Sequence, residues 1–380
     1  MIHRLDDTTI SRQALTDSIQ TLVDQADVTG LTVTVFNDDT VAYRGAFGYA
    51  NRETGDTLRT DQVFYGASLS KSVFGYLVAR LVEEGKFDLD RPVQEYFPVP
   101  IPKLQFDREW RGFANLADDA RYANITGRMC LSHTTGFPNW RWISRTGKFT
   151  PAGDIQIYSD PGTMYSYSGE GIALGQHAVE AATGRGLEEL AREYVFDPLG
   201  MDRTSYVWQE RFEGQFVNGH DTAQVVLPKD REDRAGAAGS METTPEDYAR
   251  FLQHILQLAG ADSPVTIRLF EPNIRIRSKR QFGPLALETT NENDDIELAY
   301  GLGWGLLRTP HGPGVFKEGH GEGFQHYTIL FPDQHAGIQL ISNSDNAESI
   351  FKKVLDLAIG DIYTPWAWEN YIPFDATAAN

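Results

Sequence analysis

The spacing of apolar and polar positions changes along this chain, and its first part predicts a helix followed by a hairpin. Residues 11–26 carry apolar side chains at helical spacing, which predicts an amphipathic helix. The runs 30–36 and 41–49 have the composition of strands and are separated by turn-forming residues at 37–39, which predicts two paired strands.

The end of the chain mixes strands with a helix, whereas the middle is richer in helical periodicity. Strand-like runs lie at 314–316, 327–331 and 337–342, turns at 321–323 and 332–333, and a closing helix at 349–359. Helical periodicity marks 128–133, 169–182, 186–195 and 245–259. One sheet built from both chain ends, with a helical lobe inserted between them, is the simplest arrangement.

The stretch Ser68-Leu69-Ser70-Lys71 lies where an irregular segment passes into an apolar helical stripe. At positions i and i+3 of a helix, Ser68 and Lys71 share one face and can share a proton. The amides and positive dipole end of a helix N-terminus favour an oxyanion at Ser68 and lower the pKa of Lys71. A serine with its own base is a candidate nucleophile. Because such a tetrapeptide also occurs as a solvated helix start, this interpretation needs partners elsewhere in the chain.

A hydroxyl-rich loop at 161–171 is bounded by glycines and leads into an apolar helix. Such a loop can present one phenol rigidly, or it can be a turn whose tyrosines pack on the core. A tyrosine has a pKa of about 10 in water, so a phenolate would need cationic neighbours such as a pair of lysines. Glu170, at the start of the following helix, is interpreted as a structural complement to the helix dipole.

A lysine and a histidine compete for a role after a predicted strand, in Lys317-Glu318-Gly319-His320. In one interpretation the side chain of Lys317 points to the site and Gly319 lets the substrate backbone approach. In the other, His320 is the working side chain and Lys317 is a solvated strand residue.

Three ordered motifs resemble those of the penicillin-binding protein and class C β-lactamase family of serine hydrolases. They are Ser68-x-x-Lys71, Pro161-Gly162 leading to Tyr167-Ser168, and Lys317-x-Gly319. The resemblance spans about residues 12–360 and includes the stretches 131–136, 196–201, 239–248 and 300–304.

This resemblance implies an α/β fold in which an antiparallel sheet from both chain ends is flanked by helices and a mainly helical lobe is inserted. The whole chain, 1–380, would be one catalytic domain. Its α/β lobe would comprise about 1–80 and 296–380, and its mainly helical lobe about 81–295.

The resemblance also implies catalytic roles. Ser68 would attack a carbonyl carbon while Lys71 and Tyr167 relay its proton. Lys317 would hold Tyr167 toward its anionic form and attract a substrate carboxylate. The family's loop length before a glycine-aromatic pair favours Lys317 over His320 for the third motif, so that the amides of Ser68 and His320 would bind the oxyanion. The reaction would need no metal and no cofactor.

One departure from the family changes the expected substrate. The second motif often ends in asparagine, but this chain has Gly169, so the side-chain amide that would hold a substrate carbonyl is missing. The expected substrate is therefore a small carboxylic ester or amide, with D-peptidase or weak β-lactamase activity as the alternatives. Gly169, Gly319 and Trp140 are expected to contribute to the substrate site.

The composition favours a globular protein that binds a small molecule. The 380 residues are 41% hydrophobic, and the formal charge of -19 argues against binding to nucleic acids or anionic membrane surfaces. Cys130 is the only cysteine, which excludes an internal disulfide and a multi-cysteine metal site. No signal-peptide-like segment and no run of about 18 apolar residues occurs, so a cytoplasmic location is expected. The oligomeric state stays open.

Other protein classes fit the sequence less well. It contains neither the Gly-x-Ser-x-Gly of α/β-hydrolases nor the His-Glu-x-x-His of zinc hydrolases. A binding or sensor module with the same fold would be acylated without turnover. The joint presence of Ser68, Lys71, Tyr167 and Lys317 favours an enzyme.

Overall fold

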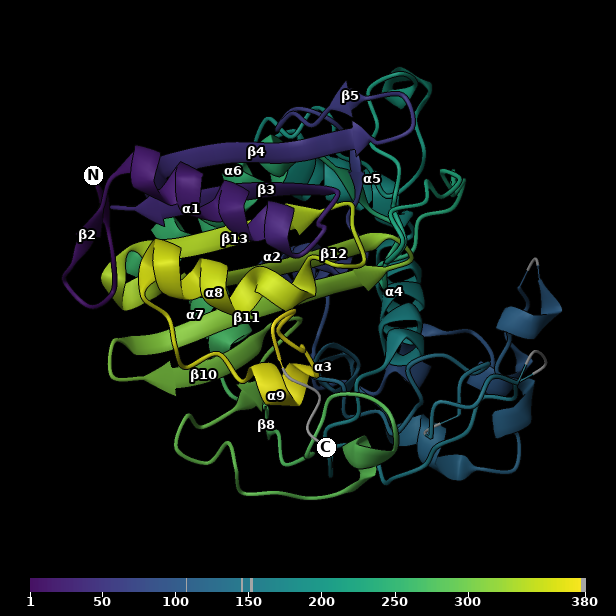
Figure 1. The fold of residues 1–380 in the computed structure, drawn as a ribbon. Helices are drawn as coiled ribbons and strands as arrows, with labels where there is room; N and C mark the ends of the chain where they lie inside the picture. Colours follow the sequence, from purple (N-terminus) through teal and green to yellow (C-terminus); the bar gives the residue numbers. More distant parts are fainter. Residues whose placement is uncertain (107, 145, 151–152, 377–380) are drawn as a thin grey trace.

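The computed structural model describes residues 1–106, 108–144, 146–150 and 153–376. A large antiparallel sheet organises the molecule and draws its strands from both ends of the chain (Figure 1). From edge to edge its strands are β5 (Asp56–Thr57), β4 (Thr40–Asn51), β3 (Gly30–Asn37), β13 (Ala336–Ser342), β12 (Phe324–Phe331), β11 (Gly312–Gly321), β10 (Gly305–Thr309), β9 (Ala299–Tyr300) and β8 (Ile274–Arg275). The α/β fold predicted from the sequence is confirmed.

The two chain ends meet where β3 pairs with β13. Leu31 lies opposite Ser342 and Phe36 opposite Gly337, so the N-terminal hairpin continues directly into the C-terminal strands. Two short pairs lie apart from this sheet, β1 (Ile2–His3) with β2 (Thr9–Ile10) and β6 (Phe64–Tyr65) with β7 (Glu242–Thr243). Strand β8 belongs to the segment 81–295 and pairs with β9, so this segment also contributes to the sheet.

Helices cover both faces of the sheet. They are α1 (Arg12–Gln25), α2 (Leu69–Glu83), α3 (Gly127–Leu131), α4 (Gly169–Thr183), α5 (Leu187–Ala191), α6 (Pro245–Gly260), α7 (Pro264–Phe270), α8 (Glu348–Ile359) and α9 (Trp366–Glu369). Helices α1 and α8 lie side by side on one face (Figure 1), while α2 and α6 pack on the other. None of the helices in the described part of the chain has both the length and the apolar character needed to cross a membrane.

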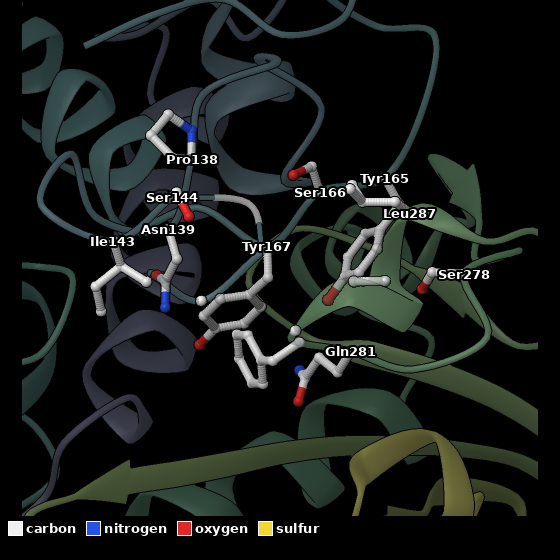
Figure 2. A pocket seen from close by; sticks show the side chains of 14 residues that line it. Pro138, Asn139, Ile143, Ser144, Tyr165, Ser166, Tyr167, Ser278, Gln281 and Leu287 are labelled. Carbon is white, nitrogen blue, oxygen red and sulfur yellow. The ribbon is translucent and has the colours of Figure 1, made fainter. Parts of the chain in front are cut away.

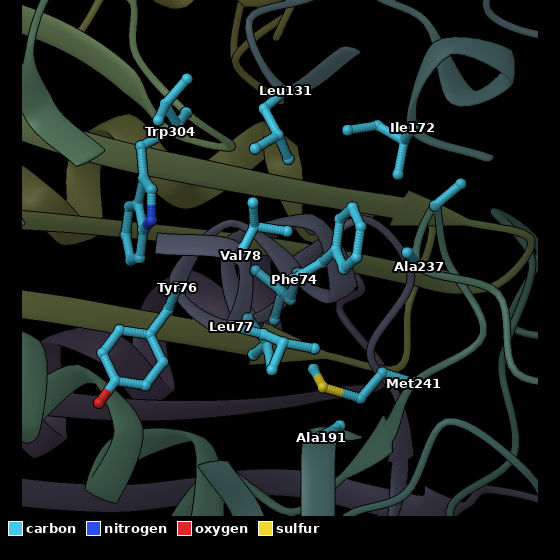
Figure 3. Close-up of a cluster of buried hydrophobic side chains, with 14 of the residues drawn as sticks. Phe74, Tyr76, Leu77, Val78, Leu131, Ile172, Ala191, Ala237, Met241 and Trp304 are labelled. Atoms are coloured by element: carbon cyan, nitrogen blue, oxygen red, sulfur yellow. The ribbon is translucent and has the colours of Figure 1, made fainter. Parts of the chain in front are cut away.

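Helix α2 runs through the main hydrophobic core. Residues 69–81 are buried except Arg80, because the helix is apolar on nearly every side. Figure 3 shows its apolar side chains among those of several distant segments, which include Leu131, Ile172, Ala191, Ala237, Met241 and Trp304. This packing on all sides fixes the rotation of α2 and therefore the direction in which Lys71 points.

The middle of the chain is less regular than its periodicity predicts. The helix predicted at 186–195 is divided into α5 and a π-helical turn at Arg192–Phe196. Between 93 and 124 the described residues form short 3-10 turns and no longer helix. Four prolines between 92 and 102 explain part of this, because proline lacks an N–H and clashes with the preceding helical turn.

Candidate active site

Ser68 and Lys71 lie at the start of α2 and are joined by a hydrogen bond. Lys71 Nζ lies 2.9 Å from Ser68 Oγ. It also donates to the carbonyl oxygen of Ala238. Ser68 is half-buried, whereas Lys71 is only 1% exposed. The i, i+3 spacing thus places a buried amine against a hydroxyl that is still partly exposed.

Burial gives Lys71 the properties of a base. It lowers the pKa of the Lys71 amine well below the ordinary 10.5, and the charge of Lys317 lowers it further. The carboxylate of Glu318 opposes this shift. A neutral amine can accept the hydroxyl proton of Ser68, whereas an ammonium group can only donate.

The backbone turns sharply just before Ser68. Ala67 has a φ of +45°, in a left-handed region that costs a non-glycine residue about 1–2 kcal/mol. Strand β6 ends at Tyr65 and α2 begins at Leu69, so this turn places Ser68 at the N-terminus of the helix. Within the described part of the chain the N–H of Ser68 has no acceptor. Such local strain is typical of functional sites.

Tyr167 and Lys317 come from two further segments and complete the group. Tyr167 precedes α4, and Lys317 lies in β11. Lys317 Nζ donates to Tyr167 Oη at 3.2 Å. Lys71 Nζ and Lys317 Nζ lie 5.0 and 5.2 Å from the centre of the Tyr167 ring. A hydroxyl, two amines and a phenol from three distant segments are therefore brought together.

Burial and nearby charges act on the pKa of Tyr167. Burial raises the pKa of Tyr167 well above 10.0, and the charge of Glu318 raises it further, whereas the Ser68 hydroxyl lowers it. Lys317 Nζ, which donates to Tyr167 Oη, also lies 2.9 Å from Glu318 Oε1 and is therefore shared between the phenol and a carboxylate. The raised pKa favours the neutral phenol, so this shift gives no support to the expectation that the lysines hold Tyr167 as an anion.

The two candidates for the third motif lie in different surroundings. The side chain of Lys317 is fully buried. The side chain of His320 is 60% exposed at the rim of the cleft, where its Nδ1 lies 2.8 Å from Glu348 Oε1. That hydrogen bond raises the pKa of His320 above 6.5, which favours the charged imidazolium over a neutral base. The structure thus brings the side chain of Lys317, not that of His320, to Tyr167.

Strand β11 has a free edge beside the site. Its pairing with β10 ends at Phe316, while its pairing with β12 continues to Gly321. The carbonyl of Glu318 accepts a hydrogen bond from Lys317 Nζ rather than from a strand neighbour. Because backbone groups alternate between the two edges of a strand, the N–H of His320 points to the same edge as this carbonyl.

Two of the residues expected in the substrate site, Gly319 and Gly169, lie so close to neighbouring groups that a larger side chain would clash. A Cβ on Gly319 would lie 3.0 Å from the His326 ring and 3.1 Å from the carbonyl oxygen of Gly66. A Cβ on Gly169 would lie 2.8 Å from the Trp140 ring. Neither glycine is among the residues that line the cleft, so their part in the substrate site stays a prediction. The third expected residue, Trp140, does line it.

Ser68, Lys71 and Tyr167 open into a cleft of about 500 Å³. Asn139 places a side-chain amide in this cleft, close to the position where the second motif lacks one. Its Oδ1 accepts a hydrogen bond from the N–H of Gly169 at 3.0 Å, which leaves the NH₂ group free to donate. An asparagine 30 residues earlier in the chain thus lies beside Gly169, where the sequence motif has no side-chain amide.

A second cavity, of about 260 Å³, adjoins the cleft (Figure 2). The two hollows share Asn139, Ile143, Tyr167, Gln281 and Phe282 in their walls. The second one is lined mainly by apolar atoms, with Leu287 on its far side. It can therefore receive an apolar part of a ligand that reaches Ser68 through the cleft.

His133 packs behind Tyr167 and was not singled out by the sequence. Their ring centres lie 4.2 Å apart, and His133 Nδ1 accepts a hydrogen bond from the N–H of Ser168 at 3.0 Å. Burial lowers the pKa of His133 well below 6.5, and the charges of Lys71 and Lys317 lower it further. His133 is thus a neutral ring that holds the loop carrying Tyr167. Its only sequence signal was its place in the stretch 131–136.

Glu170 stays outside this group. Arg141 Nε and Nη2 lie 2.9 and 2.7 Å from its two carboxylate oxygens, and both side chains are buried. A carboxylate held on both oxygens by one guanidinium is oriented and neutralised. This contact supports the structural interpretation of Glu170.

An antiparallel sheet with helices on both faces, and a serine–lysine–tyrosine group at the start of a central helix, are typical of the penicillin-recognising class of serine hydrolases. The family model described as beta-lactamase matches residues 15–359. The chain therefore belongs to the beta-lactamase family, as its three motifs indicated.

The similar proteins in this family include a penicillin-binding protein and an esterase. The chain is 26% identical to penicillin-binding protein 4 of Amycolatopsis lactamdurans, over 88% of this chain and 86% of that one. It is 28% identical to esterase EstB of Burkholderia gladioli, over 59% of this chain and 63% of that one. The crystal structure of D-alanine carboxypeptidase AmpC from Burkholderia cenocepacia superposes with a TM-score of 0.67 at 18% identity, covering 91% of this chain and 98% of that one. At these identities the comparisons define the family and the fold, and the substrate is a separate question.

Proposed function

We propose that this protein hydrolyses small carboxylic esters or amides through an acyl-serine intermediate on Ser68. The observation that carries this proposal is the contact of 2.9 Å between Ser68 Oγ and Lys71 Nζ, with the pKa of Lys71 lowered by burial. Tyr167 beside the same pair supplies a second proton-transfer group. The name of the esterase relative favours an ester as the first substrate to test.

Acylation begins when Lys71 takes the proton of Ser68 and Oγ bonds to the carbonyl carbon. The carbonyl oxygen becomes an oxyanion and is bound by the N–H groups of Ser68 and His320. One such donor is commonly worth about 2.7–4 kcal/mol of barrier. As the bond to the leaving group breaks, the Tyr167 phenol gives its proton to the leaving oxygen or nitrogen and receives the proton held by Lys71.

Deacylation repeats these transfers with water. Lys71 takes a proton from the water, which the Tyr167 phenol can relay by passing its own proton on, as the water oxygen bonds to the acyl carbon. The ester bond to Ser68 then breaks, Oγ regains a proton, and the carboxylic acid leaves. The amide of Asn139 is placed to donate to a carbonyl or ether oxygen of the substrate during both steps.

The proposal predicts that the purified protein hydrolyses 4-nitrophenyl butyrate and that a fluorophosphonate labels Ser68. A lysine-activated hydroxyl attacks both carbonyl and phosphonyl centres, so removal of the Ser68 hydroxyl should abolish hydrolysis and labelling together. Nitrophenolate release measures the first, and peptide mass spectrometry locates the label. A label on another residue contradicts the proposal. A stable acyl adduct on Ser68 without turnover would instead identify a binding or sensor module.

Lys317→Ala is expected to lower kcat by about 10²-fold, whereas His320→Ala should stay within about tenfold of the parent. Lys317 holds Tyr167 through its side chain, but His320 contributes only its backbone N–H. The charge of Lys317 also lowers the pKa of Lys71, so its removal should move the acidic limb of the pH profile to higher pH. Steady-state kinetics on both variants measure this, and an equal or larger loss in His320→Ala would contradict it.

A further inference from the structure

Three carboxylates line the cleft that contains Ser68, and they differ in their partners. They are Glu318, Glu348 and Glu369. Glu348 binds His320 at 2.8 Å, and Glu318 binds Lys317 at 2.9 Å. Glu369, at the end of α9, is 3% exposed, and in the described part of the chain neither of its carboxylate oxygens has a hydrogen-bond partner.

A third unpartnered oxygen, on Glu318, lies in the wall of the same cleft. Glu318 uses its Oε1 for Lys317 and for the side-chain amide of Gln281, whereas its Oε2 has no partner in the described residues. Glu318 is 5% exposed. Buried polar atoms without partners are costly and rare in folded proteins, so three such oxygens on one wall of a cleft indicate an unmet need for a donor.

The cations around the cleft cannot meet that need. Within the described residues its wall contains Lys71 and His320, which are engaged with Ser68 and Glu348. Lys317 lies behind the wall and is held by Glu318 and Tyr167. The same arrangement leaves no free cation for a substrate carboxylate, which argues against the expected attraction of a carboxylate by Lys317.

We propose that Glu369, together with Oε2 of Glu318, binds the ammonium group of an amine-bearing ester or amide whose carbonyl lies at Ser68. This inference deepens the proposed function and rests on it. An ammonium group offers three donors to carboxylate oxygens that have none, and such charge-assisted hydrogen bonds are the strong ones. Substrates with a free amine are therefore preferred over neutral and anionic ones.

The electrostatics of Glu369 agree with this assignment. Burial, and then the charge of Glu318, raise the pKa of Glu369, whereas the charge of Lys317 lowers it. A cation bound at Glu369 would act in the same direction as Lys317 and favour the ionised carboxylate. The cost of holding this acid in a buried site is thus offset when a cationic ligand arrives.

Calorimetric titration with n-butylammonium, butyramide and butanoate tests the preference without depending on turnover. In the parent protein n-butylammonium should bind at least about tenfold more tightly than the other two. Glu369→Gln should abolish this preference, and Glu369→Asp, which keeps the charge, should retain part of it. Glu53→Gln, an exposed site in the turn between β4 and β5, is the matched control and should keep the parent preference.

The outcomes separate this inference from the proposed function. Equal affinities for the three probes in the parent protein, or an unchanged preference in Glu369→Gln, would overturn the ammonium site. Hydrolysis of 4-nitrophenyl butyrate is measured on the same samples. Hydrolysis without an ammonium preference supports the proposed function and overturns the ammonium site. A protein that does not hydrolyse the ester contradicts the proposed function itself.

Discussion

Ser68→Ala is expected to lower the hydrolysis of 4-nitrophenyl butyrate by at least about 10⁵-fold, the scale of loss seen when a serine hydrolase loses its nucleophile. The variant removes the oxygen that forms the acyl bond and leaves the rest of the cleft unchanged. Because the side chain of Ser68 is half-buried and caps no helical N–H, the fold should be maintained. Initial rates and the melting temperature of the same sample measure both effects.

Ser70→Ala is the matched control for Ser68→Ala. Ser70 lies two residues further along α2, where its hydroxyl donates to the carbonyl of Ala67 and accepts from the N–H of Met241. Its loss leaves a buried N–H unpaired and should cost about 1–3 kcal/mol of stability, yet hydrolysis should persist. Hydrolysis that survives in Ser68→Ala and disappears in a folded Ser70→Ala would show that Ser70, and not Ser68, is the nucleophile.

Lys71→Met is expected to lower kcat/KM by about 10³–10⁴-fold, toward the upper range for the loss of a general base. Methionine fills similar space but has no amine to accept the proton of Ser68. Because the variant also removes a buried amine, the melting temperature should be unchanged or higher. Lys71→Arg keeps a positive charge that cannot be released, and it should therefore be inactive as well. An active Lys71→Arg would show that Lys71 acts through its charge rather than as a base.

The pH profile distinguishes the same two roles of Lys71. Its pKa in the folded protein is lowered, so the amine is neutral above that depressed value. The parent kcat/KM should rise with pH through the depressed pKa and reach a plateau well below pH 10.5. This acidic limb should be absent in Lys71→Met. A limb that rises only near 10.5 would mean that Lys71 keeps an ordinary pKa, and it would contradict the base mechanism.

The parts of this fold that the sequence predicted depend on short-range patterns. The hairpin of β3 and β4, the closing helix α8 and the helix after Ser68 each show a local period of apolar residues. The i, i+3 spacing of Ser68 and Lys71 is likewise set by helix geometry alone. Such features survive in a single sequence because neighbouring residues decide them.

The assignment of the third motif needed more than spacing. Lys317 and His320 lie three residues apart on one strand, and the sequence left both open. Burial of Lys317 against Tyr167, and the capture of His320 by Glu348, separate them in space. The partners that decide the matter, Tyr167 and Glu348, come from other parts of the chain.

The sequence by itself determined the class of fold and the pairing of Ser68 with Lys71 as candidate nucleophile and base, because these follow from periodicity and from residues close together in the chain. The tertiary structure decided that Tyr167 is buried with a raised pKa, that Asn139 faces the cleft beside Gly169, and that α9 brings Glu369 into the cleft wall. The physical reason is that charge and hydrogen bonding depend on burial and on neighbours through space. Those neighbours are set only when segments far apart in the sequence pack together.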